Sequence, residues 1–298
     1  MNYFLTIFRQ ILWCLALLTF PVFFVSLTWA AETKQEPEKF LLRYRFQKGD
    51  VLRWNVQYTL EHTTAMRGKT DVDRASSRST KLWTVIDVSP DGTAVFEYKV
   101  ADVNMRQEKN SQNEIRYNSK TDKEIPIRFG TLEGTIDVPL AEMTINTRGE
   151  MLKKVRKADY AGAYEDNRIA VPLPEKPVAV GDTWDIDIPI ELKKPNGTVE
   201  KITGKQKLTL KSVQTGLATI TFETEIWTPV GPETEAKIID KFTKGELKLD
   251  LDTGKTVSQE TSVNKTVIGF AGPSDQIQYQ ARWTECCCGR KACNTCKE

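Results

Sequence analysis

The feature that most constrains the fold is a run of alternating apolar residues early in the chain. Leu52, Trp54, Val56, Tyr58 and Leu60 occupy every second position, and polar or charged residues stand between them. Side chains of a β-strand point to opposite faces with a period of two, whereas a helix would spread the same residues around its surface. The segment therefore predicts a strand with one buried face and one face in water.

Three further pairs of apolar segments are separated by short turns and have the pattern of β-hairpins. The clearest turn is Ser89-Pro90-Asp91-Gly92, in which Pro and Asp favour the bend and Gly accepts a positive φ angle. We expect hairpins over residues 82–100, 143–155 and 247–260. The strongly polar residues 109–123 are expected to form a loop. Together these segments predict an all-β fold of antiparallel strands.

The two halves of the chain resemble each other. Gly49-Asp50 opens the first alternating segment and Gly181-Asp182 opens a second one, at a spacing of about 130 residues. Two further hairpin features follow in the same order in each half, which favours an internal duplication over the general likeness of any two β-meanders. We therefore expect two similar antiparallel β repeats that form curved sheets or a partial barrel, with a short helix or loop between them.

Composition is that of an ordinary folded domain. Of the 298 residues, 40% are apolar and 28% are charged, so the chain can bury a core. The 42 basic and 40 acidic residues leave a net charge of +2, and no basic stripe indicates a nucleic-acid partner. The expected divisions are a signal peptide (1–30), a polar linker (31–39), a first β repeat (40–157), a connecting segment with a short helix near 158–164 (158–177), a second β repeat (178–284) and a cysteine-rich tail (285–298).

The first thirty residues have the pattern of a secretory signal. Arg9 precedes a long apolar run, and the run ends in the small residues Thr28 and Ala30. The alternative is an uncleaved membrane anchor, because residues 11–31 are just long enough to cross a bilayer. Cys14 follows Trp13 rather than a small residue, which argues against lipid attachment there. The expected location is the periplasm, the cell surface or the extracellular space.

Residues 173–184 read L-P-E-K-P-V-A-V-G-D-T-W and precede a predicted strand. The phrase resembles one found in an uncharacterised family of exported bacterial β-proteins, a domain of unknown function. Members of that family also carry a Gly-Asp strand opening near the mature N-terminus, here Gly49-Asp50. The resemblance extends in pattern over roughly residues 40 to 270. It implies export and β structure, and it carries no activity or binding residue to this chain.

The C-terminal tail concentrates thiols. Cys286, Cys287, Cys288, Cys293 and Cys296 lie within eleven residues. In an exported chain, neighbouring cysteines favour disulfides or links between chains, and an odd number leaves one thiol over. The alternatives are a metal site and redox exchange between Cys293 and Cys296, because thiolates are soft metal ligands and C-x-x-C is a redox motif. We assign no metal and no cofactor.

Other residues offer little catalytic signal. His62 is the single histidine, and the alternation places it at the end of the first strand, where a solvated role is expected. The sequence contains no H-E-x-x-H or G-x-S-x-G motif and no glycine-rich phosphate loop. Asp50 and Asp182 stand at matched positions, but each follows a glycine and is expected to cap a turn.

These features favour a non-enzymatic protein of the cell envelope or the secreted fraction that binds an apolar, lipid-like ligand or a protein partner. One alternative is a structural or adhesion module cross-linked through the C-terminal cysteines. Another is a hydrolase that uses two carboxylates. No nucleic acid is expected as a partner, and the only expected membrane contact is the N-terminal segment, if it stays uncleaved.

Overall fold

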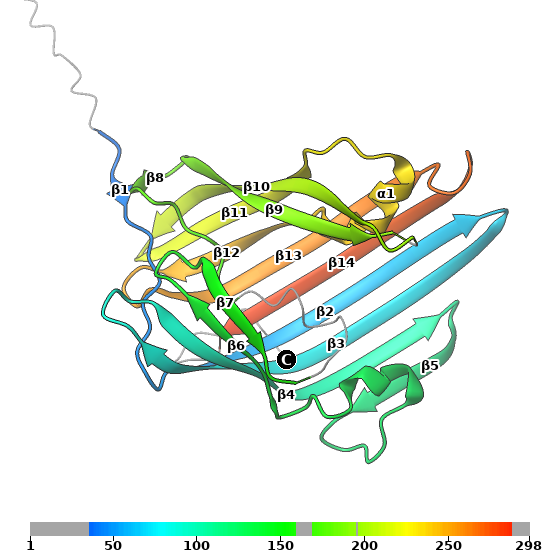
Figure 1. Cartoon of the computed structure of the whole chain (residues 1–298), viewed down its shortest axis with the longest axis horizontal. Helices are drawn as coiled ribbons and strands as arrows, with labels where there is room; N and C mark the ends of the chain where they lie inside the picture. Colours follow the sequence, from blue (N-terminus) through cyan, green and yellow to red (C-terminus); the bar gives the residue numbers. More distant parts are fainter. Residues whose placement is uncertain (1–35, 159–168, 195, 288–298) are drawn as a thin grey trace, which may run out of the picture. The chain divides into compact units, whose positions relative to one another are not determined.

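The fold is described from a computed structural model, which places residues 36–158, 169–194 and 196–287, apart from the side chain of residue 113. Contacts divide the chain into residues 1–36 and 37–298, and everything below concerns the second unit. Figure 1 shows its elements in chain order. The elements are β1 (Lys39–Phe40), β2 (Val51–Met66), β3 (Lys69–Val88), β4 (Ala94–Lys109), β5 (Gln112–Asn118), η1 (Ile127–Leu132), β6 (Pro139–Ile145), β7 (Met151–Arg156), β8 (Val178–Ala179), β9 (Thr183–Lys193), β10 (Val199–Gln214), β11 (Leu217–Ile226), α1 (Pro232–Lys237), η2 (Ile239–Lys241), β12 (Lys244–Asp250), β13 (Lys255–Ile268) and β14 (Gln276–Cys287).

The strands confirm the predicted all-β, antiparallel fold. Within the described residues, one sheet of twelve strands has the order β7-β6-β4-β3-β2-β14-β13-β12-β11-β10-β9, with β5 paired to β4. The ends β7 and β9 do not pair with each other, so the sheet is not closed into a barrel. A separate small sheet joins β1 to β8. The expected hairpin turns appear as the β3–β4, β6–β7 and β12–β13 connections.

The two halves follow one another in matching order. Strands β2, β3, β4, β6 and β7 are neighbours in this order, as are β9, β10, β11, β12 and β13, and β14 joins the two sets. The two Gly-Asp openings also make the same hydrogen bonds. The amide of Gly49 bonds to Val85 O (2.9 Å) on β3, as the amide of Gly181 bonds to Leu210 O (2.8 Å) on β10. Duplication itself stays a prediction.

One face of the sheet forms the core, and we call it the inner face. On β2 it carries the buried Leu52, Trp54 and Val56, as the alternation predicts. Side chains from β4 and β6 and side chains from β10, β11 and β12 belong to the same cluster. Because strands from distant parts of the sheet meet in one cluster, the sheet bends around its inner face. Phe96 and Leu208, both fully buried, represent the two sides.

A short segment, residues 40–46, links the two halves of the sheet at the β6–β7 and β12–β13 turns. The amide of Tyr44 bonds to Thr147 O (2.8 Å) in the β6–β7 turn. The amide of Arg45 bonds to Gly254 O (3.0 Å) in the matching β12–β13 turn. The Tyr44 hydroxyl reaches Val171 in the connecting segment, donating to its carbonyl (3.0 Å) and accepting from its amide (3.1 Å). The segment therefore ties three distant parts of the chain together.

The structure contradicts one local expectation, and a second one falls almost entirely outside the described residues. Residues 109–123 do not form a plain loop, because β4 continues to Lys109 and β5 (Gln112–Asn118) returns beside it. The reason is that Ile115 and Tyr117 alternate with polar residues, and Tyr117 is buried. The short helix expected at residues 158–164 lies almost entirely outside the described residues.

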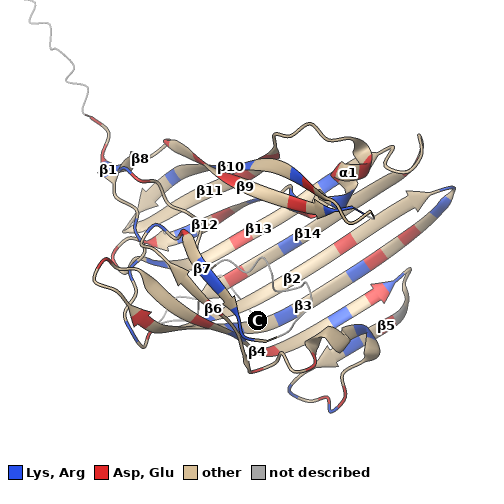
Figure 2. Ribbon diagram, viewed as in Figure 1, with Lys and Arg blue, Asp and Glu red and all other residues tan. Residues whose placement is uncertain are grey.

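Charge is dispersed over the sheet rather than gathered. Figure 2 shows basic and acidic residues interspersed along the strands, with no stripe of one sign. Many of them form pairs across neighbouring strands, such as Arg282 with Glu260 (2.7 Å). In the part of the chain that the structure places, no helix has the length and apolar character needed to cross a membrane.

Candidate functional site

The inner face continues beyond the packed core along β2 and β14. Past Val56, the inner-face residues of β2 are only half-buried. The register of β14 on β2 sets Trp283 across from Tyr58, Ala281 across from Leu60, and Tyr279 across from His62. We call these six residues the aromatic strip. The strip lies in the middle of the sheet, and its side chains are half-buried except for Ala281, which is buried.

The rings of the strip contact each other in pairs. The ring centroids of Tyr58 and Trp283 are 4.9 Å apart at an interplanar angle of 27°, a stacked arrangement. Those of His62 and Tyr279 are 6.0 Å apart at 60°, an edge-on arrangement. Such pairs contribute about 0.5–1.5 kcal/mol beyond the burial of their area. The strip is therefore an ordered surface, and its rings are held in place by one another.

Polar groups stand at the edge of the strip. The hydroxyls of Tyr58 and Tyr279 are hydrogen-bonded to each other. Burial raises the pKa of both hydroxyls, and the nearby carboxylate of Asp240 raises them further. Both hydroxyls consequently stay protonated at neutral pH. They can donate to or accept from a polar group that approaches the strip.

The segment that contains α1 and η2 covers the inner face on one side of the strip. Ile238 is buried against Ile190 and Ile202 of β9 and β10. Lys265, which lies across from Tyr279 on β13, pairs with Glu235 of α1 (2.7 Å). The Lys265 ammonium also lies 4.3 Å from the centre of the Phe242 ring. These contacts hold the covering segment beside the strip and compensate the charge of Lys265.

A short polar network lies deeper on the inner face. Gln206 Nε2 donates to Thr224 Oγ1 (3.0 Å), and the hydroxyls of Thr224 and Thr243 are 2.9 Å apart. Gln206 and Thr224 are buried, so the network satisfies groups that would otherwise be costly to bury. It separates the main core cluster from the smaller cluster beneath α1.

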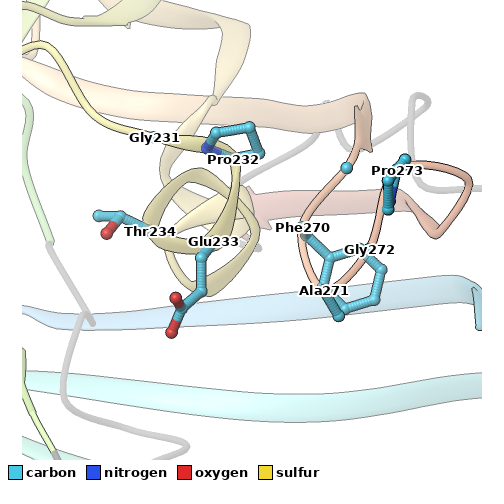
Figure 3. Close-up of a pocket in the computed structure, with 9 residues that line it drawn as sticks. Gly231, Pro232, Glu233, Thr234, Phe270, Ala271, Gly272 and Pro273 are labelled. Carbon is cyan, nitrogen blue, oxygen red and sulfur yellow. The ribbon is translucent and has the colours of Figure 1, made fainter.

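A cleft of about 780 Å³ lies between the first turn of α1 and the β13–β14 loop. In Figure 3, Pro232 and Thr234 stand on the α1 side, and Phe270 and Pro273 stand on the loop side. Glu233 is its one charged lining residue. The cleft offers no pair of carboxylates and no nucleophile with a base, so it does not support catalysis by those routes.

A second cleft of about 610 Å³ lies over β11 to β14. Charged and hydroxyl side chains of the outer face line most of it, among them Lys244, Glu246, Ser258 and Glu260. Cys286 is buried beside it and forms part of its lining. Because lysines alternate with carboxylates there, the lining has no dominant charge.

The predicted thiol cluster is only partly within the described residues. Cys286 and Cys287 end β14, on opposite faces of the sheet, where they lie across from Asn55 and Trp54 of β2. Cys288, Cys293 and Cys296 lie outside the described residues. Disulfide, metal and redox roles for the tail therefore stay predictions. Among the described residues, no three His, Cys, Asp or Glu side chains are grouped closely enough to hold a metal ion.

The matched aspartates cap turns in the structure. The Asp50 carboxylate accepts from the amide of Gln47 (3.0 Å), and the Asp182 carboxylate accepts from the amide of Ala179 (2.8 Å). Asp50 also pairs with Lys255 (2.7 Å). Burial raises the pKa of the Asp50 carboxyl, but the bonds from Lys255 and Gln47 outweigh it and leave that pKa below its usual value. These contacts account for Asp50 and Asp182 as residues that cap the turns before β2 and β9.

His62 was expected at a strand end, and the structure places it elsewhere. The strand β2 runs on to Met66, so His62 lies inside it, across from Asp73 of β3 and Tyr279 of β14. The expectation is wrong because the apolar alternation ends at Leu60, whereas Thr63 and Thr64 continue the strand and threonine is well suited to a pleated strand. The histidine is half-buried and belongs to the aromatic strip.

Sequence reasoning missed most of the strip. The sequence places Tyr58 and Leu60 on the buried face, but their partners Trp283 and Ala281 come from the far end of the chain. One signal could have found them, because Ile277, Tyr279, Ala281 and Trp283 alternate with polar residues. Nothing in a single sequence gives the pairing of β14 with β2.

Neither a family model nor a curated protein matches the sequence, so the resemblance at residues 173–184 stays a prediction. A solved structure described as "Lipid-protein interactions in lipovitellin" is similar to this chain, with 11% identity and a TM-score of 0.47 over 82% of this chain and 26% of that one. The Salmonella SPI-1 type III secretion injectisome secretin InvG, in its open gate state, is similar at 7% identity and a TM-score of 0.17 over 82% of this chain and 61% of that one. This chain thus spans about a quarter and about three fifths of these two chains. Neither likeness is close enough to assign a fold or a function to this protein.

Proposed function

We propose that this protein is an exported, non-enzymatic binding protein and that an amphipathic, lipid-like molecule lies along the aromatic strip. The observation that carries the proposal is the continuation of the inner face past the core as a half-buried apolar and aromatic surface. An apolar chain placed over Leu60 removes the remaining accessible surface of this half-buried side chain from water, at roughly 25 cal/mol for each Å² covered. Export is supported by the pattern of residues 1–30.

The polar groups beside the strip support an amphipathic ligand rather than a wholly apolar one. Tyr58 and Tyr279 present protonated hydroxyls, and Asp240 stands near both. Ligand sites of this kind combine a mostly apolar lining with a few polar groups that fix orientation. The apolar part of the ligand then lies against Leu60, and its polar end lies toward the hydroxyls.

The test uses the full chain and Nile red, an uncharged dye whose fluorescence rises in apolar surroundings. We expect saturable binding that 1-decanol displaces. Leu60→Glu places a charge on the strip, and we expect it to weaken dye binding about tenfold or more, because burying a leucine contributes about 1.5–3 kcal/mol. Thr59→Glu is the matched control, since Thr59 is the neighbouring residue on the opposite, exposed face.

The two variants are compared after circular dichroism and thermal unfolding have shown that both are folded. Equal dye binding by Leu60→Glu and the native chain contradicts the proposal. Dye binding that 1-decanol does not displace contradicts it too, because the dye then occupies a surface unrelated to an alkyl-chain site.

A further inference from the structure

The connection between β11 and β12 is longer than the two strands require. Ile226 ends β11 and Lys244 begins β12, yet Glu223 of β11 already lies across from Lys244. The intervening residues contain α1 and η2 and add no strand to the sheet. We call residues 229–242 the covering segment. Long connections of this kind include the lids of binding sites.

Both ends of the covering segment are fixed to the sheet. The amides of Trp227 and Thr228 donate to Thr203 O on β10 (2.8 and 3.2 Å), and the Thr228 hydroxyl accepts from the Thr203 amide (2.8 Å). At the other end, the carbonyl of Thr243 accepts from the amide of Thr224 on β11 (2.8 Å). Any movement of the segment is therefore confined to the residues between these two anchors.

The covering segment has open space where α1 begins. An added Cβ atom at Gly231 would meet no other atom within 4 Å, and Pro232 and Glu233 are exposed. The cleft of about 780 Å³ separates this end of the segment from the β13–β14 loop, as Figure 3 shows. The cleft leaves room beside α1 for the segment to move.

The underside of the covering segment packs on a cluster of its own. Ile238 is 2% exposed, and it packs with Ile190 of β9 and Ile202 of β10 in a small cluster apart from the main core. Lifting the segment would uncover this small cluster and leave the main core closed. Parts of a protein that bury few apolar contacts open at a lower free energy than the core does.

The remaining contacts of the covering segment converge on Lys265 of β13. Its ammonium pairs with Glu235 of α1 (2.7 Å) and lies 4.3 Å from the centre of the Phe242 ring. The side chains of Lys265 and Glu235 are 32% and 27% exposed. An ion pair with this access to solvent stabilises only weakly, so it adds a small margin to the closed position.

The covering segment also reaches the polar edge of the aromatic strip. Its η2 turn lies close to β13 and β14. Asp240 of η2 is near enough to Tyr58 and Tyr279 to raise the pKa of both hydroxyls. A ligand whose polar end lies at these hydroxyls therefore lies beside η2, and it passes the covering segment on entering and leaving.

We infer that the covering segment is a gate, which opens between its two anchors to admit the lipid-like ligand to the aromatic strip and is latched by the Lys265–Glu235 pair. The inference rests on the proposed function and adds control of access to the same site. The latch stabilises the closed position with or without ligand. Its loss should therefore speed entry and exit alike, whereas the loss of a ligand contact would lower the affinity.

The experiment measures both rate constants of Nile red binding to the full chain by stopped-flow fluorescence. Glu235→Gln removes the charge of the latch in nearly the same shape. We expect the association and dissociation rate constants to rise by the same factor, about two- to fivefold, which is the range that a partly exposed ion pair supports. The ratio of the two rate constants, and hence Kd, should stay at the native value.

Glu233→Gln is the matched control on the same helix. Glu233 pairs with Lys237 (2.6 Å), which belongs to the covering segment itself, so this variant loses an ion pair without losing the latch. Hydrogen exchange gives a second readout that needs no ligand. The amide of Lys241, which donates to Ile238 O (2.9 Å), should exchange faster in Glu235→Gln and at the native rate in Glu233→Gln.

The outcomes separate the gate from the function on which it rests. If the native chain does not bind the dye, the proposed function fails and the gate fails with it. If the dye binds but Glu235→Gln keeps both native rate constants, the gate is wrong while the binding site stands. A change in Kd without a matched change in both rate constants overturns the gate too. Native hydrogen exchange at Lys241 in Glu235→Gln shows that the pair is not a latch.

Discussion

Replacing Tyr44 by phenylalanine should destabilise the protein far more than the loss of one oxygen atom suggests. Tyr44 is 1% exposed, and its hydroxyl satisfies both backbone groups of Val171. Val171 is itself buried, so the variant leaves an amide and a carbonyl without their partner. Each unsatisfied buried group costs about 1–3 kcal/mol, so the two groups together give a loss of roughly 2–6 kcal/mol in the free energy of unfolding.

Urea denaturation followed by tryptophan fluorescence measures this change. Tyr117→Phe is a suitable control, because Tyr117 is 6% exposed and no hydrogen bond of its hydroxyl is present among the described residues. We expect the control to stay within about 0.5 kcal/mol of the native chain. A Tyr44→Phe variant as stable as this control refutes the reasoning, because the bonds to Val171 then contribute nothing.

The same variant should change the response to alkaline pH. Burial raises the pKa of Tyr44 from 10.0 to about 12. A folded-state pKa above the unfolded value gives stability that is fully present below about pH 10 and is lost as pH rises through about 12. The two-unit difference corresponds to about 3 kcal/mol, so the gap between native and Tyr44→Phe stability should narrow over this range.

Three further changes have defined outcomes. Gly245→Ala places a Cβ atom 2.0 Å from a backbone oxygen of β13, so we expect a loss of about 1–3 kcal/mol or more by urea denaturation, whereas Gly231→Ala, which meets nothing within 4 Å, should cost little. Glu285→Gln removes the charge from a mostly buried pair with Lys81 (2.9 Å), and we expect about 3 kcal/mol of destabilisation that added salt changes little. Asp50 has a lowered pKa, so its contribution is present above the unfolded value and is lost as pH falls through the folded one. The free energy of unfolding of Asp50→Asn should therefore fall less between neutral and acid pH than that of the native chain. If the two chains lose the same stability on acidification, Asp50 does not have this role.

The period-two alternation was sufficient to predict the class of the fold. The alternating residues Leu52, Trp54 and Val56 of β2 are buried as expected, and the turn at Ser89–Gly92 has its positive φ at Gly92. These features depend on neighbours in sequence, so one sequence contains them. The strand β5 was missed because its polar residues outnumber its two apolar ones, and only its packing against β4 explains it.

The aromatic strip could not be predicted in the same way. It depends on which strands become neighbours, and β14 pairs with β2 across more than two hundred residues of chain. The pair of Lys265 and Glu235 illustrates the same limit. In sequence they are two charged residues of different segments, and only the fold brings them together (2.7 Å). Local sequence patterns predict the strands, whereas the register between strands determines which residues form the site.

The position of β14 has a consequence for how the molecule is made. The last described strand to be synthesised fills the centre of the sheet, between β13 and β2, instead of extending an edge. Until β14 has been synthesised, the two halves can form only as separate sheets. Each sheet then has an unpaired edge strand, β2 or β13, where β14 will later lie. A nascent chain therefore cannot complete its structure before its last described strand has been made.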